Sequence, residues 1–389
     1  MDLGLKLVRE GDTDLYVPEK SLAGGAPDTY PVFYNPAAKT NRDISVCVAS
    51  VTRPATFLDA LAGTGARGVR VGNEGNRGRG KGAAPQVTLV DFNRMSLQVA
   101  RRNVKLNGLG RRCTVTHSET NRFLCSRFDR GEKFEAVDVD PFGSPAPYIQ
   151  AALTACAPGA ILSFTATDAA VLCGVYPLVS LRRYGASSIR NEFVHETGLR
   201  TLMGFAARAG GVNDIGVEPV LAHSTLHYLR VYLRVRRGAT EADRAMEGLG
   251  YVTQCNTCLE RWASKLPSER CDSCGRKVRS SGPLWTGKVA ESGLVSQSAK
   301  FGSERGWKEA ESIIASLGRV DDFPPFSYSL ERACSLKKVS STSVEKVIGE
   351  LQSNGFSAMR QPFELDGIKT DATHEEFVQA VVAASRLLR

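Results

Sequence analysis

The chain has 389 residues, of which 42% are hydrophobic and 23% are charged, and it carries a formal net charge of +9. A chain of this length is longer than one hydrophobic core ordinarily holds, so we expect two or three domains. The composition is typical of a soluble, globular protein. No run of about 18 apolar residues occurs, so we expect no membrane span. The positive charge favours a polyanionic partner, although many basic proteins bind none.

Cysteine use indicates the compartment. Ten cysteines are present, and six of them stand singly in apolar segments. This distribution is typical of reduced thiols in a cytoplasmic protein rather than of a disulfide framework. Residues Met1 to Lys6 carry no signal-peptide core, which agrees with a cytoplasmic location. Nothing in the sequence implies an obligate protein partner.

The first part of the chain alternates short apolar runs with helical stretches. The runs with strand character are Thr56–Asp59, Val87–Asp91, Cys113–Thr116, Ala136–Val139 and Gly159–Thr165. Helical stretches between them include Arg94–Asn107 and Ala146–Ala157. This alternation predicts an α/β fold with a mostly parallel, doubly wound sheet that binds ligands at the carboxyl ends of its strands. The alternating segment His223–Arg236 is expected to form a long edge strand that closes this domain.

A glycine-rich basic segment, Gly72 to Gly82, follows the first predicted helix of this domain. Its composition predicts a flexible insert at the amino ends of the strands, away from the ligand-binding edge. We interpret it as a solvated loop, and contact with RNA is the alternative.

A break near Arg237 to Ala245 divides the chain into residues 1–238 and residues 239–389. The second part contains two Cys-x-x-Cys pairs within residues 255–274, a helical segment Gly302–Leu317 and a turn at Pro324-Pro325. We therefore expect a C-terminal α+β domain with a cysteine-rich ribbon or knuckle.

The tail of this second domain, residues 328–370, is typical of a winged helix. It reads as helix, turn, helix and hairpin, in which Ser341-Thr342-Ser343 caps an amphipathic helix Val344–Ser353. The segment Phe356–Lys369 is expected to form the two-stranded wing. Winged helices bind nucleic acid or pack against proteins, and the sequence favours neither.

Cys255, Cys258, Cys271 and Cys274 form two pairs separated by twelve residues. This spacing predicts a four-thiolate zinc site. A closed four-cysteine site leaves no open position, so the expected zinc is structural and contributes on the order of 10 kcal/mol to folding. The alternative is a ribbon that folds without metal. Basic residues near the pairs either bind phosphates or are solvated: Arg261, Lys265, Arg270, Arg276, Lys277 and Arg279.

A glycine loop, Gly63-Thr64-Gly65-Ala66-Arg67-Gly68, stands between the first predicted strand and its helix. Gly63 and Gly65 allow the backbone to approach a nucleotide-like ligand. This loop alone does not distinguish a dinucleotide from S-adenosylmethionine, so an NAD-dependent oxidoreductase remains an alternative. Asp91 ends the next strand, where an acid accepts hydrogen bonds from two ribose hydroxyls. Glu119-Thr120 follow the third strand and are placed to meet an adenine edge.

The fourth strand of the predicted sheet ends in Asp140-Pro141-Phe142-Gly143. Pro141 and Gly143 turn the chain, so Phe142 is expected beside the Asp140 carboxylate. A carboxylate next to an aromatic ring suits an exocyclic amine on a flipped base, because one accepts the N–H and the other stacks on the ring. A dehydrogenase has no use for this element, which therefore favours a base-amine methyltransferase. The alternative is a turn in which Asp140 only caps the chain.

Other polar and aromatic residues have two interpretations. His195 and Glu196 are structural or belong to a base pocket, because methyl transfer needs no imidazole. Phe33 and Tyr34 either line the base pocket or lie in the core.

The chain resembles the tRNA (guanine-26-N2)-dimethyltransferase family over nearly its whole length. The family usually carries Asp-Ala where this chain has Glu119-Thr120, and a Thr-His-containing stretch where it has Ser357–Pro362. The segments that carry the resemblance are Pro31–Pro36, Asn41–Asp43, Leu58–Arg70, Asp138–Pro145, Thr165–Asp168, Phe193–Glu196 with Arg200, His227–Val231, the two cysteine pairs and Gly282–Trp285.

The resemblance implies a Rossmann-like class I methyltransferase domain over residues 1–238 and a tRNA-binding domain over residues 239–389. It implies transfer of one and then two methyl groups from S-adenosylmethionine to the 2-amino group of guanine 26 in tRNA. Asp140 is then the catalytic carboxylate, assisted by the Pro141 carbonyl, and Phe142 stacks on the base. Cofactor contacts are implied for Arg42, Arg67, Asp91, Glu119 and Thr120.

Two further alternatives remain open. The same enzyme chemistry acts on an exocyclic amine at another RNA or DNA site, or the chain is a non-catalytic RNA-binding zinc protein with a relic methyltransferase domain. The intact Asp140-Pro141-Phe142 motif argues against the second.

Overall fold

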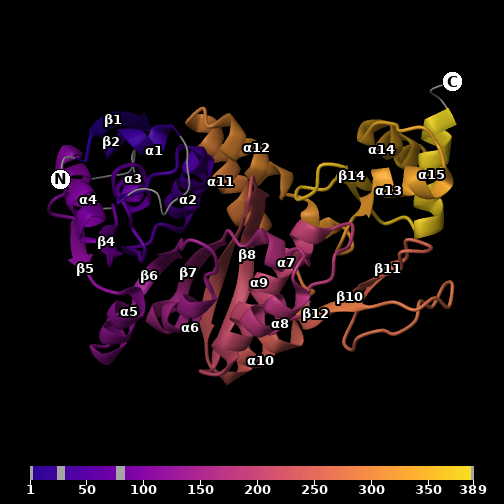
Figure 1. The fold of residues 1–389 in the computed structure, drawn as a ribbon, viewed down its shortest axis with the longest axis horizontal. Helices are drawn as coiled ribbons and strands as arrows, with labels where there is room; N and C mark the ends of the chain where they lie inside the picture. The colour runs from indigo at the N-terminus through magenta and orange to yellow at the C-terminus, as the bar shows by residue number, and fades with distance from the viewer. Residues whose placement is uncertain (1–2, 24–30, 76–83, 387–389) are drawn as a thin grey trace.

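The computed structural model describes residues 3–23, 31–75 and 84–386, and a seven-stranded sheet lies at its centre (Figure 1). The strands follow the order β5-β4-β3-β6-β7-β9-β8. Strands β3 to β7 are parallel, whereas β9 is antiparallel to both β7 and β8. The predicted mostly parallel, doubly wound sheet is confirmed. The strand bounds are Thr56–Asp59 (β3), Gln86–Asp91 (β4), Cys113–His117 (β5), Phe134–Val139 (β6), Cys156–Ala166 (β7), Ile215–Thr225 (β8) and Tyr228–Arg237 (β9).

Helices cover both faces of this sheet. Helices α3 (Ala66–Glu74) and α4 (Arg94–Leu106) share one core with β4 and with strand β2 of the N-terminal hairpin. Helices α5, α6 and α9 share a second core with β6, β7 and β8. Because both faces are covered, every side chain of β6 except Glu135 is buried, as are those of residues 160–166 in β7. The other elements of this half are β1 (Leu5–Glu10), β2 (Thr13–Pro18), α1 (Glu19–Leu22), η2 (Pro36–Ala38), α2 (Lys39–Thr52), α5 (Thr120–Asp129), α6 (Ala146–Ala155), α7 (Ala169–Leu172), α8 (Pro177–Tyr184) and α9 (Val194–Gly211).

The expectation of one long edge strand over His223–Arg236 is wrong. The segment contains a tight turn with Leu226 at a φ of 53°, so its first residues belong to β8 and the rest form β9. Strand β9 lies inside the sheet, and β8 forms the edge. The alternating pattern arose because Arg230 is buried and ion-paired with Asp138 rather than exposed to solvent.

The predicted flexible insert Gly72–Gly82 is wrong in its first residues. Helix α3 continues through Gly72 to Glu74, and a Cβ on Gly72 would lie 3.2 Å from a methyl carbon of Val87. Glu74 is buried and pairs with Arg70 at 2.9 Å. This close packing and ion pair keep the glycine-rich sequence helical. Residues 76–82 lie outside the described residues.

The single helix expected over Gly302–Leu317 is wrong as well. It is divided into α11 (Ser292–Glu304) and α12 (Lys308–Ser316), with Gly306 between them at a φ of 70°. Side chains of both helices join those of α2 in one hydrophobic core. The two helices therefore pack against the N-terminal half, although they follow it by more than 50 residues.

A small antiparallel sheet, β11-β10-β12, carries the four cysteines on its loops. We call residues 249–285 the cysteine arm. Figure 1 shows β10 and β11 extending away from the central sheet beside the C-terminal helices. The arm contacts those helices through Leu259, which is buried in their core. The bounds are Ala239–Glu247 (α10), Leu249–Gln254 (β10), Arg261–Ser264 (β11) and Ser280–Trp285 (β12).

The tail contains the predicted helix, turn, helix and hairpin. Helix α14 spans Val344–Ser353 as expected, and the Ser343 hydroxyl accepts a hydrogen bond from the Lys346 N–H at 3.3 Å. A last helix, α15, was not predicted and completes the core of this unit. The remaining bounds are Val320–Asp322 (η3), Tyr328–Ser329 (β13), Leu330–Lys337 (α13), Ala358–Arg360 (β14), Gly367–Thr370 (β15) and His374–Arg386 (α15). No helix among those described has the length and apolar character needed to cross a membrane.

Buried charges join α9 to the C-terminal tail. Glu196 is fully buried, accepts a hydrogen bond from Arg200 Nε at 2.9 Å and lies 3.5 Å from Lys369 Nζ. Gln361 and the Phe326 N–H also donate to its carboxylate. Burial raises the pKa of Glu196, but Lys369 and Arg200 outweigh it and lower the pKa to about 2. Glu196 is thus a carboxylate on which two buried cations depend.

Replacing Glu196 tests this contact. We expect Glu196→Ala to lower the free energy of unfolding by about 3–5 kcal/mol, because it leaves Arg200 and Lys369 buried without a counter-charge. The matched control Glu218→Ala removes an exposed pair with Arg236 and should cost about 0–1 kcal/mol. Urea denaturation of both variants measures the difference, and equal losses would contradict the assignment.

The same contact predicts a pH dependence. The pKa of Glu196 is lowered from 4.5 to about 2, so its contribution to stability is complete above pH 4.5 and is lost as the pH falls toward 2. The stability difference between native protein and Glu196→Ala should therefore narrow below pH 4.5 in the same denaturation experiment. A difference that stays constant down to pH 3 would disprove this linkage.

Candidate active site

A cavity of about 450 Å³ opens at the carboxyl ends of β3 and β6. Its position matches the edge at which doubly wound sheets bind ligands. The residues that line it are Phe33, Tyr34, Asn35, Ala38, Asn41, Arg42, Asp59, Leu61, Ala62, Gly63, Thr64, Ala66, Arg67, Asp140, Pro141, Phe142, Thr165, Thr167 and Tyr228.

The glycine loop forms one wall of this cavity. Glycine is needed at its first two glycine positions, Gly63 and Gly65, for different physical reasons. Gly63 has a φ of 53°, and a Cβ built on it would meet only the Phe33 carbonyl oxygen, 3.9 Å away. The backbone there is open to a ligand. Gly65 has a φ of 76°, and its Cβ would lie 3.1 Å from Ala100 Cβ and from Leu89 Cδ1. Gly65 is therefore needed for packing against α4 rather than for ligand approach.

Arg67 connects the Asp140-Pro141-Phe142 motif to the core. Its guanidinium forms an ion pair with Asp140, donates a hydrogen bond to Asn41 Oδ1 at 2.7 Å, and lies 3.2 Å from Asp138 Oδ1. Burial raises the pKa of Asp140, but the charges of Arg67 and Arg230 outweigh it, so the pKa lies below its usual range. With 29% of its side chain exposed, Asp140 is a carboxylate that opens into the cavity.

Phe142 stands beside this carboxylate with 68% of its surface exposed. Its ring contacts Phe33 edge-to-face, with centroids 5.5 Å apart. The turn that holds it is fixed, because the Gly143 N–H donates to Thr167 Oγ1 at 2.7 Å and Ser144 Oγ lies 2.6 Å from the Tyr184 hydroxyl. An exposed aromatic on a fixed turn is suited to stack on a planar ligand. The sequence left open whether Phe33 and Tyr34 line a pocket or lie in the core. Both line the cavity, and Tyr34 is also buried in the core that includes α3 and α4.

Arg42 lines the cavity but is already paired. Its Nε donates to Glu10 Oε2 at 2.8 Å and its Nη2 to Glu10 Oε1 at 2.5 Å. Burial by itself raises the pKa of Glu10, but Arg42 and Arg70 have the larger, opposite effect, and the pKa is lowered to about 2. Glu10 was missed because it lies in an N-terminal hairpin, 32 residues from Arg42, and no local pattern connects the two.

The other predicted cofactor residues lie at neighbouring strand ends, outside the cavity lining. Asp91 accepts hydrogen bonds from the N–H groups of Gly63 and Asn93, both at 2.7 Å. Glu119 caps α5 by accepting from two backbone N–H groups, and the buried Thr120 hydroxyl donates to the Ala60 carbonyl at 2.8 Å. The structure thus brings Arg42, Arg67, Gly63 and the Asp140 motif together around the cavity. Asp91, Glu119 and Thr120 lie beside them and hydrogen-bond to the backbone of the neighbouring loops.

His195 and Glu196 lie away from the cavity. His195 Nδ1 lies 2.5 Å from Glu364 Oε2, and its backbone N–H also bonds Glu364. Of the two interpretations left open for these residues, the structure supports the structural one.

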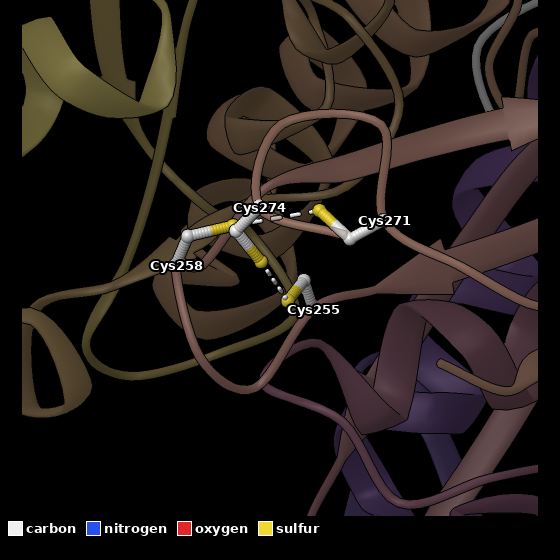
Figure 2. Close-up of side chains that lie close together, drawn as sticks. All are labelled: Cys255, Cys258, Cys271 and Cys274. Carbon is white, nitrogen blue, oxygen red and sulfur yellow. Dashed lines mark hydrogen bonds between the residues drawn. The ribbon is translucent and has the colours of Figure 1, made fainter. Parts of the chain in front are cut away.

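The four predicted zinc ligands converge from two loops of the cysteine arm (Figure 2). All four sulfur atoms lie within 4.8 Å of one another. Cys255 and Cys274 are 3.5 Å apart, and Cys258 and Cys271 are 3.6 Å apart. Zinc–sulfur bonds of about 2.3 Å in a tetrahedron require sulfur separations of about 3.8 Å. The cluster is therefore compatible with zinc.

The backbone around the cysteines is arranged in two equivalent turns. The Cys255 carbonyl accepts from the Leu259 N–H at 2.9 Å, and the Cys271 carbonyl accepts from the Gly275 N–H at 2.8 Å. Leu259 and Gly275 both have a φ of 69°. Two like turns facing one another are the arrangement that the Cys-x-x-Cys spacing predicts.

Comparison with known proteins finds relatives that match the chain over nearly its whole length. The relative from Methanoculleus marisnigri, named tRNA (guanine(26)-N(2))-dimethyltransferase, is 36% identical over 94% of this chain and 95% of its own length. A relative of the same name from Methanosphaera stadtmanae is 31% identical over 97% of this chain and 96% of its own length. The solved structure of Trm1 from Pyrococcus horikoshii with S-adenosyl-L-methionine superposes with a TM-score of 0.84, at 30% identity, over 97% of this chain and 99% of that one.

A family model matches the chain almost from end to end. The model describes the N2,N2-dimethylguanosine tRNA methyltransferases and matches residues 11–382. The match spans the glycine loop, the Asp140 motif and the cysteine arm together. The chain therefore belongs to the N2,N2-dimethylguanosine tRNA methyltransferase family.

Proposed function

We propose that this enzyme transfers one and then two methyl groups from S-adenosylmethionine to the exocyclic 2-amino group of guanine 26 in tRNA. The observation that carries the proposal is that the Asp140 carboxylate and the exposed Phe142 ring stand side by side in the cavity that the glycine loop also lines. A dinucleotide-dependent dehydrogenase has no need for this pair. The names of the relatives support the position in tRNA.

The residues around the glycine loop fit S-adenosylmethionine. The backbone at Gly63 is open, and Arg67 together with Arg42 lines the same cavity. We assign cofactor contacts to Arg42, Arg67 and Gly63, with Asp91, Glu119 and Thr120 at the neighbouring strand ends, whereas Gly65 holds the loop against α4. The cofactor supplies an electrophilic methyl group on a sulfonium.

Asp140 orients the amine of the guanine. A guanine 2-amino group is a poor nucleophile because its lone pair is delocalised into the ring. Asp140 accepts one N–H and the Pro141 carbonyl accepts the other, which turns the lone pair toward the methyl group, and alignment supplies much of the acceleration. Because its pKa is lowered, Asp140 is a weak base. A weak base is sufficient once the nitrogen has gained a methyl and a positive charge.

The second methylation needs space for the methyl already present. Gly143 follows Phe142 with a φ of 76°, and a Cβ built on it meets no atom within 4 Å. This open space next to the stacking ring supports successive methylation at one site.

The first test of the proposal replaces the carboxylate. We expect Asp140→Asn to lower kcat for methylation of unmodified tRNA by about 10²–10⁴-fold, because the oriented acceptor is lost. Asp129→Asn, an exposed acid on α5, is the matched control and should retain activity. Nucleoside analysis of digested tRNA measures both products. Unreduced dimethylguanosine in Asp140→Asn would disprove the catalytic role, and a product at another nucleotide would disprove the target.

A structural zinc ion in the cysteine arm is the second part of the proposal. The sulfur separations support it, and a closed set of four thiolates leaves no position for catalysis. The ion would replace a core in this arm, where the buried cluster consists of Cys255, Cys271 and Val278.

Metal analysis tests the zinc proposal. We expect one zinc per native chain and its loss in Cys258→Ser, with a lowered melting temperature because metal binding stabilises the folded arm. Cys125→Ser removes a lone exposed cysteine and should change neither quantity. Native protein that contains no zinc and melts unchanged in a chelator would contradict the proposal.

The C-terminal part is proposed to bind the tRNA. Residues 239–389 contain the cysteine arm and the winged-helix-like unit over residues 328–370, and we place the domain boundary at 238/239. Support comes from the exposed basic residues of the arm, which include Arg270, Arg276 and Lys277.

A further inference from the structure

A second cavity, of about 520 Å³, lies between the central domain and the cysteine arm. This volume is within the range of about 300–1,000 Å³ that is usual for ligand sites. One wall comes from the segments around α8, including Gly174, Pro177 and Arg190. The other wall comes from the end of β10 and from residues 277–281 of the arm. None of the predicted catalytic, cofactor or zinc residues lines this cavity.

The cavity has an unbalanced positive charge. Arg190, Lys277 and Arg279 line it, all three are exposed, and none forms an ion pair within the described part of the chain. No acidic residue is among those that line it. The larger cavity beside α10 differs, because acids such as Glu218, Glu241 and Asp321 line it together with its basic residues. The positive cavity therefore favours an anionic ligand.

A buried amide also points to a ligand. Gln254 lines the cavity with 9% of its surface exposed, and its Oε1 accepts the Glu192 N–H at 3.0 Å. Its Nε2 makes no hydrogen bond of normal geometry among the described residues, although it lies close enough to the Glu192 carboxylate to oppose the rise that burial causes in the pKa of that group. A buried donor without a partner costs free energy unless a ligand or water accepts from it. The Glu192 carboxylate is itself held by the Ser329 N–H, which donates to it at 3.2 Å.

Both walls are held in place before any ligand binds. The segment after α8 pairs with β12, because the Ser187 N–H donates to the Gly282 carbonyl at 2.9 Å and the Gly282 N–H returns a bond at 2.8 Å. The Ile189 N–H donates to Ser281 Oγ at 2.8 Å. A preformed cavity loses little conformational entropy on binding.

Helix α8 connects this cavity to the catalytic turn. Pro177 at its start lines the cavity, and Tyr184 at its end contacts Ser144, two residues after Phe142. The helix has eight residues, so it is about 12 Å long. Tyr176, directly before it, is an aromatic with 55% of its surface exposed. A site for an anion lies here next to an exposed aromatic ring, one short helix away from the site proposed to handle a base. This combination suits a polynucleotide ligand.

We infer that this cavity binds one nucleotide of the substrate RNA outside the target guanine, with Arg190, Lys277 and Arg279 on its phosphate and Gln254 Nε2 donating to it. Tyr176 stacks on a base at the rim. The inference rests on the proposed function, since it deepens how the enzyme holds tRNA. The site fixes the distance between the bound strand and Asp140.

Charge-removal variants test the phosphate contacts. In the cavity triple variant, Arg190→Ala, Lys277→Ala and Arg279→Ala, we expect tRNA affinity to fall about tenfold or more at physiological salt. The slope of log Kd against log salt should fall by about 0.7–0.9, since the contact to one phosphate is lost. The matched control removes three exposed, unpaired charges at the opposite edge of the sheet, as Lys105→Ala, Arg111→Ala and Arg112→Ala. It should change affinity less than twofold and leave methylation intact.

A separate variant tests the nucleoside. Tyr176→Ala should weaken tRNA binding several-fold without changing the salt slope, because stacking is not ionic. Binding of S-adenosylhomocysteine by calorimetry should be equal in all variants and reports that they are folded. A cavity triple variant that binds tRNA like the control overturns the site, and an unaffected Tyr176→Ala overturns the nucleoside assignment.

The outcomes separate this inference from the proposed function. Native protein that dimethylates tRNA while the cavity triple variant keeps its KM for tRNA removes only the cavity inference. Native protein that neither binds nor methylates tRNA removes both.

Discussion

The candidate site depends on a buried charge network around Asp138. Arg230 forms an ion pair with Asp138, both side chains are fully buried, and Ser163 donates to the same carboxylate at 2.6 Å. Arg67 extends the network from Asp138 to Asp140, at the cavity. Buried charges are costly to desolvate and are held only where each has a well-placed partner. The position of the Asp140 carboxylate is therefore fixed by strands β6 and β9 and helix α3 together.

The electrical balance of this network involves one more acid. Asp59 ends β3 with 2% of its surface exposed, and burial together with the charge of Asp138 raises its pKa to about 7. With a pKa of about 7, Asp59 carries less negative charge at neutral pH than an ordinary carboxyl group does. The charges of Arg67 and Arg230 meanwhile hold the pKa of Asp140 below its usual range, which favours the ionised state that an acceptor of N–H bonds requires.

The two halves of the chain are connected near this network, where α9 is attached to the tail through Glu196 and Lys369. Within the N-terminal half, the turn after Asp140 is attached to α8 through Ser144 and Tyr184. The hydrophobic core that surrounds β6 and β7 also includes side chains of α11 and α12. A movement of the C-terminal half would therefore act on the elements that position Asp140, which suits an enzyme that must hold a large polynucleotide while it acts on one base.

Sequence by itself determined the local elements and the site motifs. The strands of the parallel sheet, helix α14 with its Ser343 cap, the glycine loop and the two cysteine pairs were all predictable, because each follows from spacing or composition within a few residues. Asp140 and Phe142 were predictable for the same reason, since a strand end and a turn place them side by side.

The tertiary structure alone decided where the charges go. Arg230 gave an alternating pattern that indicated an exposed edge, yet it is buried against Asp138, 92 residues away along the chain. Glu10 satisfies Arg42, and Gly72 is helical because Val87 and Cys113 pack against it. Ion pairs and close packing between distant segments have no local signature, because a residue's neighbours in space are set by the whole topology.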